Sequence, residues 1–214
     1  YTEELVDKHN FGFLFAPIYH GAMRHAAVPR RELGVKTIMN LLGPLVNPAG
    51  ASYQLIGVYD ERYVPIVAEA AHLLGIKRAM VVHGSDGIDE ISISAPTRTI
   101  TVDENGSTDE RTITPEEFGI TGHALSDLSG GTPAENAEMA RELLAGGGRA
   151  AIRDAVTVNA AAALSLYGTV DSLEAGVERV RRALAEGEVA EFVKKIVAAS
   201  GSLAERAAKE AGAA

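Results

Sequence analysis

The sequence predicts an α/β fold, with a central, mainly parallel sheet, an antiparallel hairpin and flanking helices. Three observations predict this class. Residues 53–59, 64–74 and 79–82 have the patterns of a strand, a helix and a strand joined by short links, which is the order of a βαβ unit. The Asn-Gly pair at 105–106 is the strongest hairpin turn signal in the chain. Helical patterns dominate the last third of the sequence.

The composition is that of a globular protein and excludes several classes. The 214 residues, 46% hydrophobic and 23% charged, can bury a core without crosslinks. Cysteine is absent, which excludes disulfides, thiolate catalysis and cysteine-ligated metal sites in this chain. The net charge of -9 argues against sequence-independent nucleic-acid binding, which requires a basic surface. No apolar run approaches the roughly 18 residues of a membrane-spanning helix.

We expect three regions along the chain. Residues 1–50 carry short helical patterns and a loop marked by Pro44 and Pro48. Residues 51–203 form the α/β domain, and residues 204–214 form a tail that frays.

The strands and the first helix of the α/β domain follow from local patterns. Tyr53–Tyr59 is rich in β-formers, and Val64–Leu74 has helical periodicity. The short apolar run Ala79–Val82 is typical of a buried parallel strand. Ile91–Val102 alternates, and Thr108–Ile113 would return as its hairpin partner.

The later helices have clear signals. A helix over 132–144 opens with Thr132, a proline and Glu135, the order of a capping box. This helix start also explains the preceding Gly130-Gly131 pair, which resembles a phosphate-binding loop but lacks its lysine. Three further helices are expected, the first of them buried, over Ile152–Tyr167, Leu173–Glu186 and Val189–Ser200.

The first candidate site is a basic segment in an acidic protein. Between residues 11 and 58 there are four basic residues, Arg24, Arg30, Arg31 and Lys36, against the single acid Glu32. An arginine fork can hold a carboxylate or phosphate through two parallel hydrogen bonds, which favours a small anionic ligand. A solvated helix face is the alternative interpretation.

The second candidate site is the acidic pair Asp89 and Glu90, which follows the expected strand 79–82. Ligands of open α/β sheets bind beyond the carboxyl ends of the strands. In a loop, both carboxylates can reach one Mg²⁺ ion, which takes one or two carboxylates plus water and phosphate oxygens. The alternative is an ordinary turn at Asp86-Gly87.

Four sequence blocks and a shorter signature resemble those of a known family. The blocks are F-G-F-L-F-A-P at 11–17, H-G-A-M-R at 20–24, V-P-R-R-E-L-G at 28–34 and N-L-L-G-P-L-V-N-P at 40–48. The signature is V-V-H-G at 81–84 with G-I-D-E-I-S at 87–92, and Asn159, Ala160, Ala161 and Leu164 fit a late helix. From about Phe11 to Leu203, the sequence strongly resembles the anthranilate phosphoribosyltransferase family.

The resemblance implies a function and a cellular setting. Enzymes of this family transfer the phosphoribosyl group of phosphoribosyl pyrophosphate to anthranilate, in tryptophan biosynthesis. We therefore expect Mg²⁺ as cofactor, small-molecule substrates, a homodimer, a cytoplasmic location, and neither nucleic-acid nor membrane partners. The implied fold is the nucleoside phosphorylase/phosphoribosyltransferase architecture, in which residues 1–50 are a hinge and helices packed on a helical domain.

The resemblance also implies roles for single residues. Arg30 matches the arginine that holds the anthranilate carboxylate. His20, Pro44 and Met23 match residues along the anthranilate channel. Asp89 and Glu90 match the acidic pair that binds Mg²⁺, and no residue matches a catalytic acid or base.

Two departures from the family pattern matter. Gly21 stands where the family usually has proline, which loosens the turn that aims His20. The family's glycine-rich loop, G-T-G-G-D, and its K-H-G-N segment are not in the sequence. We therefore expect this chain to be the carboxyl-terminal portion of an enzyme, inactive alone. Apolar residues such as Leu41 would lack the helical domain as a partner and would have to be exposed, repack or be covered by another chain.

Three alternatives stay open. A pyrimidine nucleoside phosphorylase relative would share the architecture, but the block around Arg30 favours the anthranilate enzyme. A non-enzymatic relative that binds nucleic acid should be basic and lack the acidic pair. The chain could also serve only as a folding or structural unit.

Overall fold

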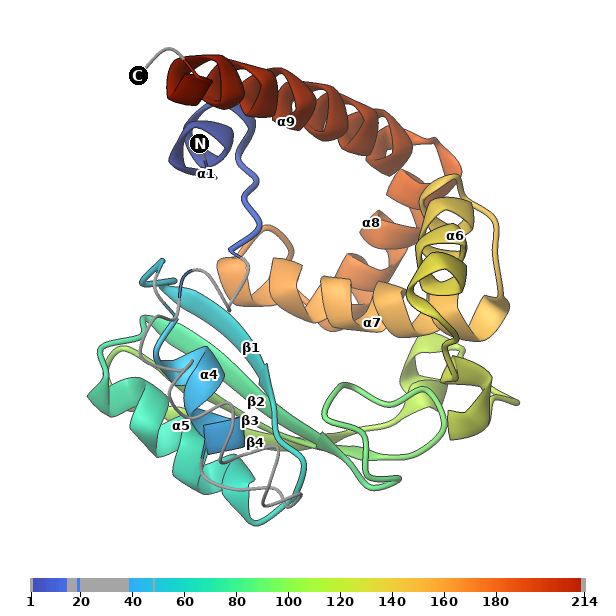
Figure 1. Cartoon of the computed structure of the whole chain (residues 1–214). Coiled ribbons are helices and arrows are strands. Elements are labelled where there is room, and N and C mark those ends of the chain that lie inside the picture. Colours follow the sequence, from blue (N-terminus) through green and yellow to red (C-terminus); the bar gives the residue numbers. More distant parts are fainter. Residues whose placement is uncertain (1, 15–18, 20–38, 48, 213–214) are drawn as a thin grey trace.

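The computed structural model describes residues 2–14, 19, 39–47 and 49–212. Its centre is a four-stranded sheet in the order β1-β2-β3-β4, with helices on both faces (Figure 1). The α/β class is therefore confirmed. The strands are β1 (Tyr53–Gly57), β2 (Arg78–Gly84), β3 (Thr97–Asp103) and β4 (Thr108–Ile113).

The sheet is mixed, which corrects the expectation of a mainly parallel one. Strands β1 and β2 are parallel, whereas the β2–β3 and β3–β4 pairs are antiparallel. Parallel pairing needs a crossover element, and within the described residues only α5 (Tyr63–Leu73) connects two strands in that way. The hairpin is confirmed, since β3 and β4 are joined at Asn105-Gly106 and Gly106 has a φ of 77°.

Strand β3 begins later than the sequence predicts. We expected a strand from Ile91, but it starts at Thr97. The reason is that residues 91–96 form local hydrogen bonds within a compact loop. For example, the Ser92 N–H donates to Thr97 Oγ1 at 2.9 Å. Alternation of small polar and apolar residues does not distinguish such a loop from a strand.

Strand β2 divides the core into two halves because its side chains alternate between faces. Ala79 and Val81 pack into a cluster under α5, whereas Met80 and Val82 pack into a second cluster under α7 (Ala150–Tyr167). All four are buried. Burying one valine side chain contributes about 1.5–3 kcal/mol, so this continuous apolar run anchors the sheet from both sides.

The remaining helices match the sequence closely until the last one. They are α1 (Thr2–His9), α4 (Met39–Leu45), α6 (Pro133–Leu144), α8 (Leu173–Ala185) and α9 (Glu188–Gly212), with 3₁₀ turns at Pro115–Phe118 and Leu125–Leu128. The Thr132–Glu135 capping box is confirmed: the Thr132 N–H donates to Glu135 Oε2 at 2.7 Å, and the Glu135 N–H donates to Thr132 Oγ1 at 3.3 Å. Helix α9 continues to Gly212, whereas we expected it to end at Ser200.

Packing contacts connect helices α1 and α4 to the rest of the described chain. Helix α1 lies beside α9 (Figure 1), where the rings of Phe11 and Phe192 meet edge to face with centroids 6.2 Å apart. Leu41 of α4 is buried in the cluster under α5, so packing within this chain is the outcome that the structure shows for Leu41. Among the described residues, no helix is both long enough and apolar enough to span a membrane.

Candidate functional site

The acidic pair lies in the loop between β2 and β3, at the carboxyl end of β2. Asp89 and Glu90 are both exposed and belong to no strand, as the sequence predicts. A mid-strand position would have sent the two side chains to opposite faces of the sheet. The loop position is therefore compatible with joint binding of one ion.

The first half of the loop is organised by Asp86. Its Oδ2 accepts hydrogen bonds from the Ser92 and Ser94 hydroxyls, each at 2.6 Å. Ser92 Oγ in turn accepts from the backbone N–H groups of Ser94 and Ala95 at 3.0 and 3.1 Å. Burial opposes the ionisation of Asp86, but the hydrogen bonds from Ser92 and Ser94 outweigh it and lower its pKa. The carboxylate at the turn is thus a structural centre of the loop.

Two glycines let the loop approach the sheet closely. A Cβ at Gly84 would lie 2.6 Å from Ile88 Cγ2 and 2.7 Å from Asp86 Oδ1. A Cβ at Gly57, in the neighbouring strand β1, would overlap the backbone carbonyl of Asp89. The backbone of Asp89 therefore rests directly on β1 at a point where only glycine fits.

The other half of the loop is held by Asn159 of α7. The Ile91 N–H donates to Asn159 Oδ1 at 2.9 Å, and Asn159 Nδ2 donates to the Ile91 carbonyl at 3.1 Å. The same amide donates to the Ala155 carbonyl at 3.0 Å, one turn earlier in the helix. A single side chain therefore fixes both backbone groups of the residue that follows the acidic pair.

The electrostatics of the pair are those of two crowded like charges. Partial desolvation by surrounding protein, and then the charge of Asp89, raise the pKa of Glu90. Neither carboxylate has a hydrogen bond or ion pair with any part of the chain that the structure describes. Among the described residues, no cationic side chain pairs with either carboxylate.

The donor set fits a hard divalent cation. Carboxylate oxygens are the ligands that Mg²⁺ prefers, and Mg²⁺ commonly takes one or two of them while water or substrate phosphates fill the remaining positions. No group of three or more metal-ligating side chains occurs within the described ranges. The pair could therefore hold Mg²⁺ only together with such additional oxygen ligands.

Two hollows flank the loop. One, of 350 Å³, lies on its β3 side, where Arg98 bridges Glu110 at 2.7 Å and Glu61 at 3.5 Å. His83 also lines it, and its Nδ1–H donates to the Val58 carbonyl at 2.8 Å. The other hollow, of 460 Å³, lies between the loop and α7 and is mainly apolar. Its lining includes Ile88, Glu90, Leu128, Val156 and Asn159.

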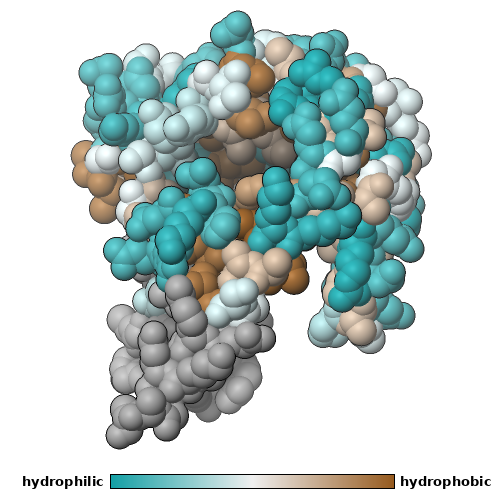
Figure 2. All heavy atoms as spheres, turned by 90° about the horizontal axis from the view of Figure 1, so that it is seen from above, coloured by the Kyte–Doolittle hydropathy of each residue, from teal (hydrophilic) through white to brown (hydrophobic). Residues whose placement is uncertain are grey.

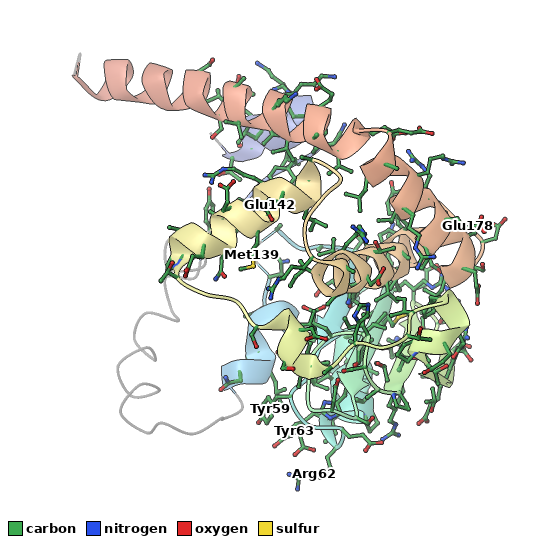
Figure 3. All side chains as sticks on the ribbon, turned by 90° about the vertical axis from the view of Figure 1, so that its right-hand side faces the viewer. Tyr59, Arg62, Tyr63, Met139, Glu142 and Glu178 are labelled. Carbon is green, nitrogen blue, oxygen red and sulfur yellow. The ribbon has the colours of Figure 1, made fainter. Side chains whose placement is uncertain are left out.

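The residues that follow β1, next to the loop, form a ring contact and an ion pair with each other. The rings of Tyr59 and Tyr63 pack with centroids 5.2 Å apart, while Arg62 projects outward beside them (Figure 3). Arg62 Nη2 lies 2.7 Å from Asp60 Oδ2, and this hydrogen-bonded pairing lowers the pKa of Asp60 to about 2. Because Arg62 is 82% exposed, the pair contributes little to stability.

Of the four residues expected to bind anthranilate, the described residues include Pro44. Pro44 lies within α4 and is half-buried. Arg30, His20 and Met23 lie outside the described residues, so their roles stay predictions.

The sequence alone does not reveal the roles of three supporting residues. Asn159 fits the pattern of a late helix, and Asp86 is typical of a turn. Gly57 carried no signal beyond its place inside a β-rich run. Their function depends on contacts across the fold, such as the 68-residue separation between Asn159 and Ile91.

Comparison with known proteins identifies clear relatives. A family model described as "Glycosyl transferase family, a/b domain" matches residues 1–190. The anthranilate phosphoribosyltransferase of Desulfosudis oleivorans is 44% identical over 196 residues, which are 92% of this chain and 58% of that protein. The enzyme of the same name from Moorella thermoacetica is 46% identical over 193 residues, covering 90% of this chain and 56% of that protein.

Solved structures give the same picture. The crystal structure of anthranilate phosphoribosyltransferase from Thermus thermophilus matches with a TM-score of 0.82 and 42% identity, over 92% of this chain and 58% of that chain. The Saccharomyces cerevisiae enzyme in complex with PRPP and Mg matches with a TM-score of 0.82 and 29% identity, over 93% and 57%. The chain thus spans less than two thirds of the length of these relatives.

Proposed function

Because the chain belongs to the glycosyl transferase family with an a/b domain, we propose that it forms part of an anthranilate phosphoribosyltransferase. The reaction transfers the phosphoribosyl group of phosphoribosyl pyrophosphate to the amine of anthranilate and releases pyrophosphate, in tryptophan biosynthesis. Relatives that share 44% and 46% of its residues carry this name. Since the chain spans 58% of the first relative, the activity is assigned to a longer assembly.

The observation that carries the proposal is the exposed acidic pair on a loop fixed at the carboxyl end of β2. Asp89 and Glu90 would hold Mg²⁺. The bound ion would neutralise charge on the leaving pyrophosphate. The contribution of this chain is to hold the two carboxylates in place, through Asp86 within the loop and Gly57 beneath it.

The second contribution of the chain is to bind the nucleophile. In this proposal Arg30 holds the anthranilate carboxylate with a planar two-bond contact, which aims the amine at the ribose carbon. His20, Pro44 and Met23 line the path of the aromatic ring. The aromatic amine is uncharged at neutral pH and needs no strong base, which agrees with the absence of a candidate acid–base residue from the family match.

The setting of the enzyme is also a proposal. On the resemblance alone, we propose a homodimer that acts on small molecules in the cytoplasm. The negative net charge of -9 supports the expectation that nucleic acid is not a partner.

Growth of a tryptophan auxotroph tests the proposed function. A strain lacking its own anthranilate phosphoribosyltransferase would receive this chain joined to the part of the Moorella thermoacetica relative that lies outside the matched region. We expect growth without tryptophan, and loss of growth when Asp89→Asn and Glu90→Gln are combined. Failure of the joined protein to support growth, although it is folded and expressed, would contradict the assignment.

A further inference from the structure

We propose that Asn159 is a positioning residue for the acidic pair, and that its carboxamide fixes the loop so that Asp89 and Glu90 face one divalent cation. The inference rests on the proposed function, because that function assigns the pair to a metal ion. It adds a residue from α7, a different element of the fold, to the support of the site.

The geometry shows what the carboxamide holds. The Ile91 N–H and carbonyl are bonded to the two ends of the same Asn159 amide, at 2.9 and 3.1 Å. A third bond, to the Ala155 carbonyl at 3.0 Å, fixes the orientation of the amide on its own helix. The Asn159 side chain is thereby fixed on α7 by the bond to Ala155, and it fixes the loop by the two bonds to Ile91.

The position of Ile91 makes this contact relevant to the metal pair. The Ile91 N–H belongs to the peptide plane that also contains the carbonyl and Cα of Glu90, because a peptide unit is rigid. A bond to that N–H therefore orients the backbone of Glu90 directly. The Asp89 carbonyl, which lies between the two acidic residues, packs against Gly57 of β1. The pair is thus held from β1 at its centre and from α7 at its carboxyl end.

A restraint is needed because the pair opposes its own arrangement. Asp89 and Glu90 are adjacent in the sequence, and neither has a hydrogen bond or ion pair with the described residues, so the two carboxylates repel each other when both are ionised. The 460 Å³ hollow beside Glu90 and Asn159 offers space into which a released loop could move. Asn159 therefore opposes a movement of the loop that the repulsion would favour and the hollow would allow.

A purely structural role for Asn159 makes a different prediction. Ile91 and Ile93 are each only 1% exposed, and their burial contributes to stability whether or not a metal binds. Asn136 of α6 is a matched control, because its amide bonds both backbone groups of Gly131 in the same way. The Gly131 N–H donates to Asn136 Oδ1 at 2.7 Å, and Asn136 Nδ2 donates to the Gly131 carbonyl at 3.2 Å. No acidic pair precedes Gly131, as one precedes Ile91, so loss of this second carboxamide should leave metal binding unchanged.

Mn²⁺ binding to the 214-residue chain tests the inference, since Mn²⁺ replaces Mg²⁺ at oxygen sites and the free ion is counted by electron paramagnetic resonance. We expect Asn159→Ala to raise the Kd for Mn²⁺ by roughly tenfold or more, the usual effect of losing a supporting bond to a metal site. Asn136→Ala should match the wild type. Amide hydrogen exchange at Ile91 should accelerate in metal-free Asn159→Ala.

A conservative variant separates positioning from folding. Asn159→Gln keeps the amide one methylene farther from the helix, so we expect a Kd between those of the wild type and Asn159→Ala. If Asn159→Ala does not fold, as judged by circular dichroism, Asn159→Gln alone decides, and a Kd equal to that of the wild type overturns the inference.

The outcomes distinguish this inference from the function on which it rests. Equal Mn²⁺ affinity in Asn159→Ala and the wild type, with binding lost in Asp89→Asn plus Glu90→Gln, would overturn the role of Asn159 and leave the metal site standing. Absence of Mn²⁺ binding to the wild type would contradict the metal site itself, and this inference with it.

Discussion

Glu90 is a residue at which stability and the proposed function oppose each other. Its pKa is raised, first by partial desolvation from surrounding protein and then by Asp89, so a proton binds more tightly to Glu90 in the folded chain than in the unfolded chain. Stability therefore falls as the pH rises from the ordinary glutamate value of 4.5 through the raised one. Such a cost at an exposed, unpaired carboxylate is expected where a cation is meant to bind.

This opposition gives a measurable pH dependence. In the absence of metal, we expect Glu90→Gln to melt at a higher temperature than the wild type at pH 7. The difference should vanish below about pH 4, where glutamate is protonated in both states. Thermal melts across this range check the prediction, and Glu178→Gln on the outer face of α8, far from the loop, serves as the control (Figure 3). A stabilisation that does not depend on pH would show that charge is not the cause.

Arg30 carries the specificity prediction. In the assembled enzyme, Arg30→Ala should raise the KM for anthranilate much more than the KM for the ribose donor. Losing a charge-assisted two-bond contact costs about 1.5–3 kcal/mol, which is roughly ten- to a hundredfold in binding. Arg30→Lys should restore only part of the loss, since an ammonium group cannot reproduce the planar fork. Equal effects on both substrates would indicate a structural arginine.

At the scale of elements, local patterns predicted most of the fold. Strand β2 and helices α6, α7 and α8 lie where the sequence places them, because an apolar run, a capping box and helical periodicity are local signals. The start of β3 was missed because Ser92 and Ser94 alternate with isoleucines as they would in a strand. The acidic pair was found because its position after β2 is a local feature.

The support of that pair could not be predicted, because it comes from two elements that are distant from the pair in the sequence. Asn159 contributes from α7 and Gly57 from β1, and neither contact is visible without the fold. Nor did the sequence show that the sheet is mixed, since strand direction after β2 depends on how the loop at 85–96 turns back.

The contact between β1 and the loop yields a prediction at this scale. Gly57→Ala should displace the Asp89 backbone, because a Cβ would overlap its carbonyl. We expect a loss of stability of about 1–3 kcal/mol from overpacking, and weaker Mn²⁺ binding. The control is Gly201→Ala, since Gly201 lies in α9 with open space around it. There, alanine should stabilise the helix by up to about 1 kcal/mol. Unchanged melting and Mn²⁺ affinity for Gly57→Ala would contradict the close contact.

The molecule as a whole exposes several large apolar side chains. Figure 2 shows apolar residues gathered in a hollow on the face seen from above. Phe13, Tyr167 and Val197 are 71%, 68% and 65% exposed. Exposed apolar patches are typical of interaction surfaces or of proteins that aggregate.

Self-association of the 214-residue chain is therefore expected. The chain alone should bind a hydrophobic dye or sediment as more than a monomer, and both effects should decrease when the remaining part of a relative is joined to it. Sedimentation velocity over a concentration series measures this. A dye-silent monomer at all concentrations would contradict the prediction.

We propose that this chain supplies the metal-binding and nucleophile-binding part of a phosphoribosyltransferase. The most direct test is the rate of anthranilate consumption with phosphoribosyl pyrophosphate and Mg²⁺. It compares the chain alone, the chain joined to the remainder of the Moorella thermoacetica relative, and the same joined protein with Asp89→Asn and Glu90→Gln. We expect no turnover by the chain alone, because each missing donor to a leaving group can cost about a hundredfold or more. We expect turnover by the joined protein, reduced by at least about a hundredfold in the double variant. Turnover by the chain alone, or full activity of the double variant, would show that this chain does not supply that part of the enzyme.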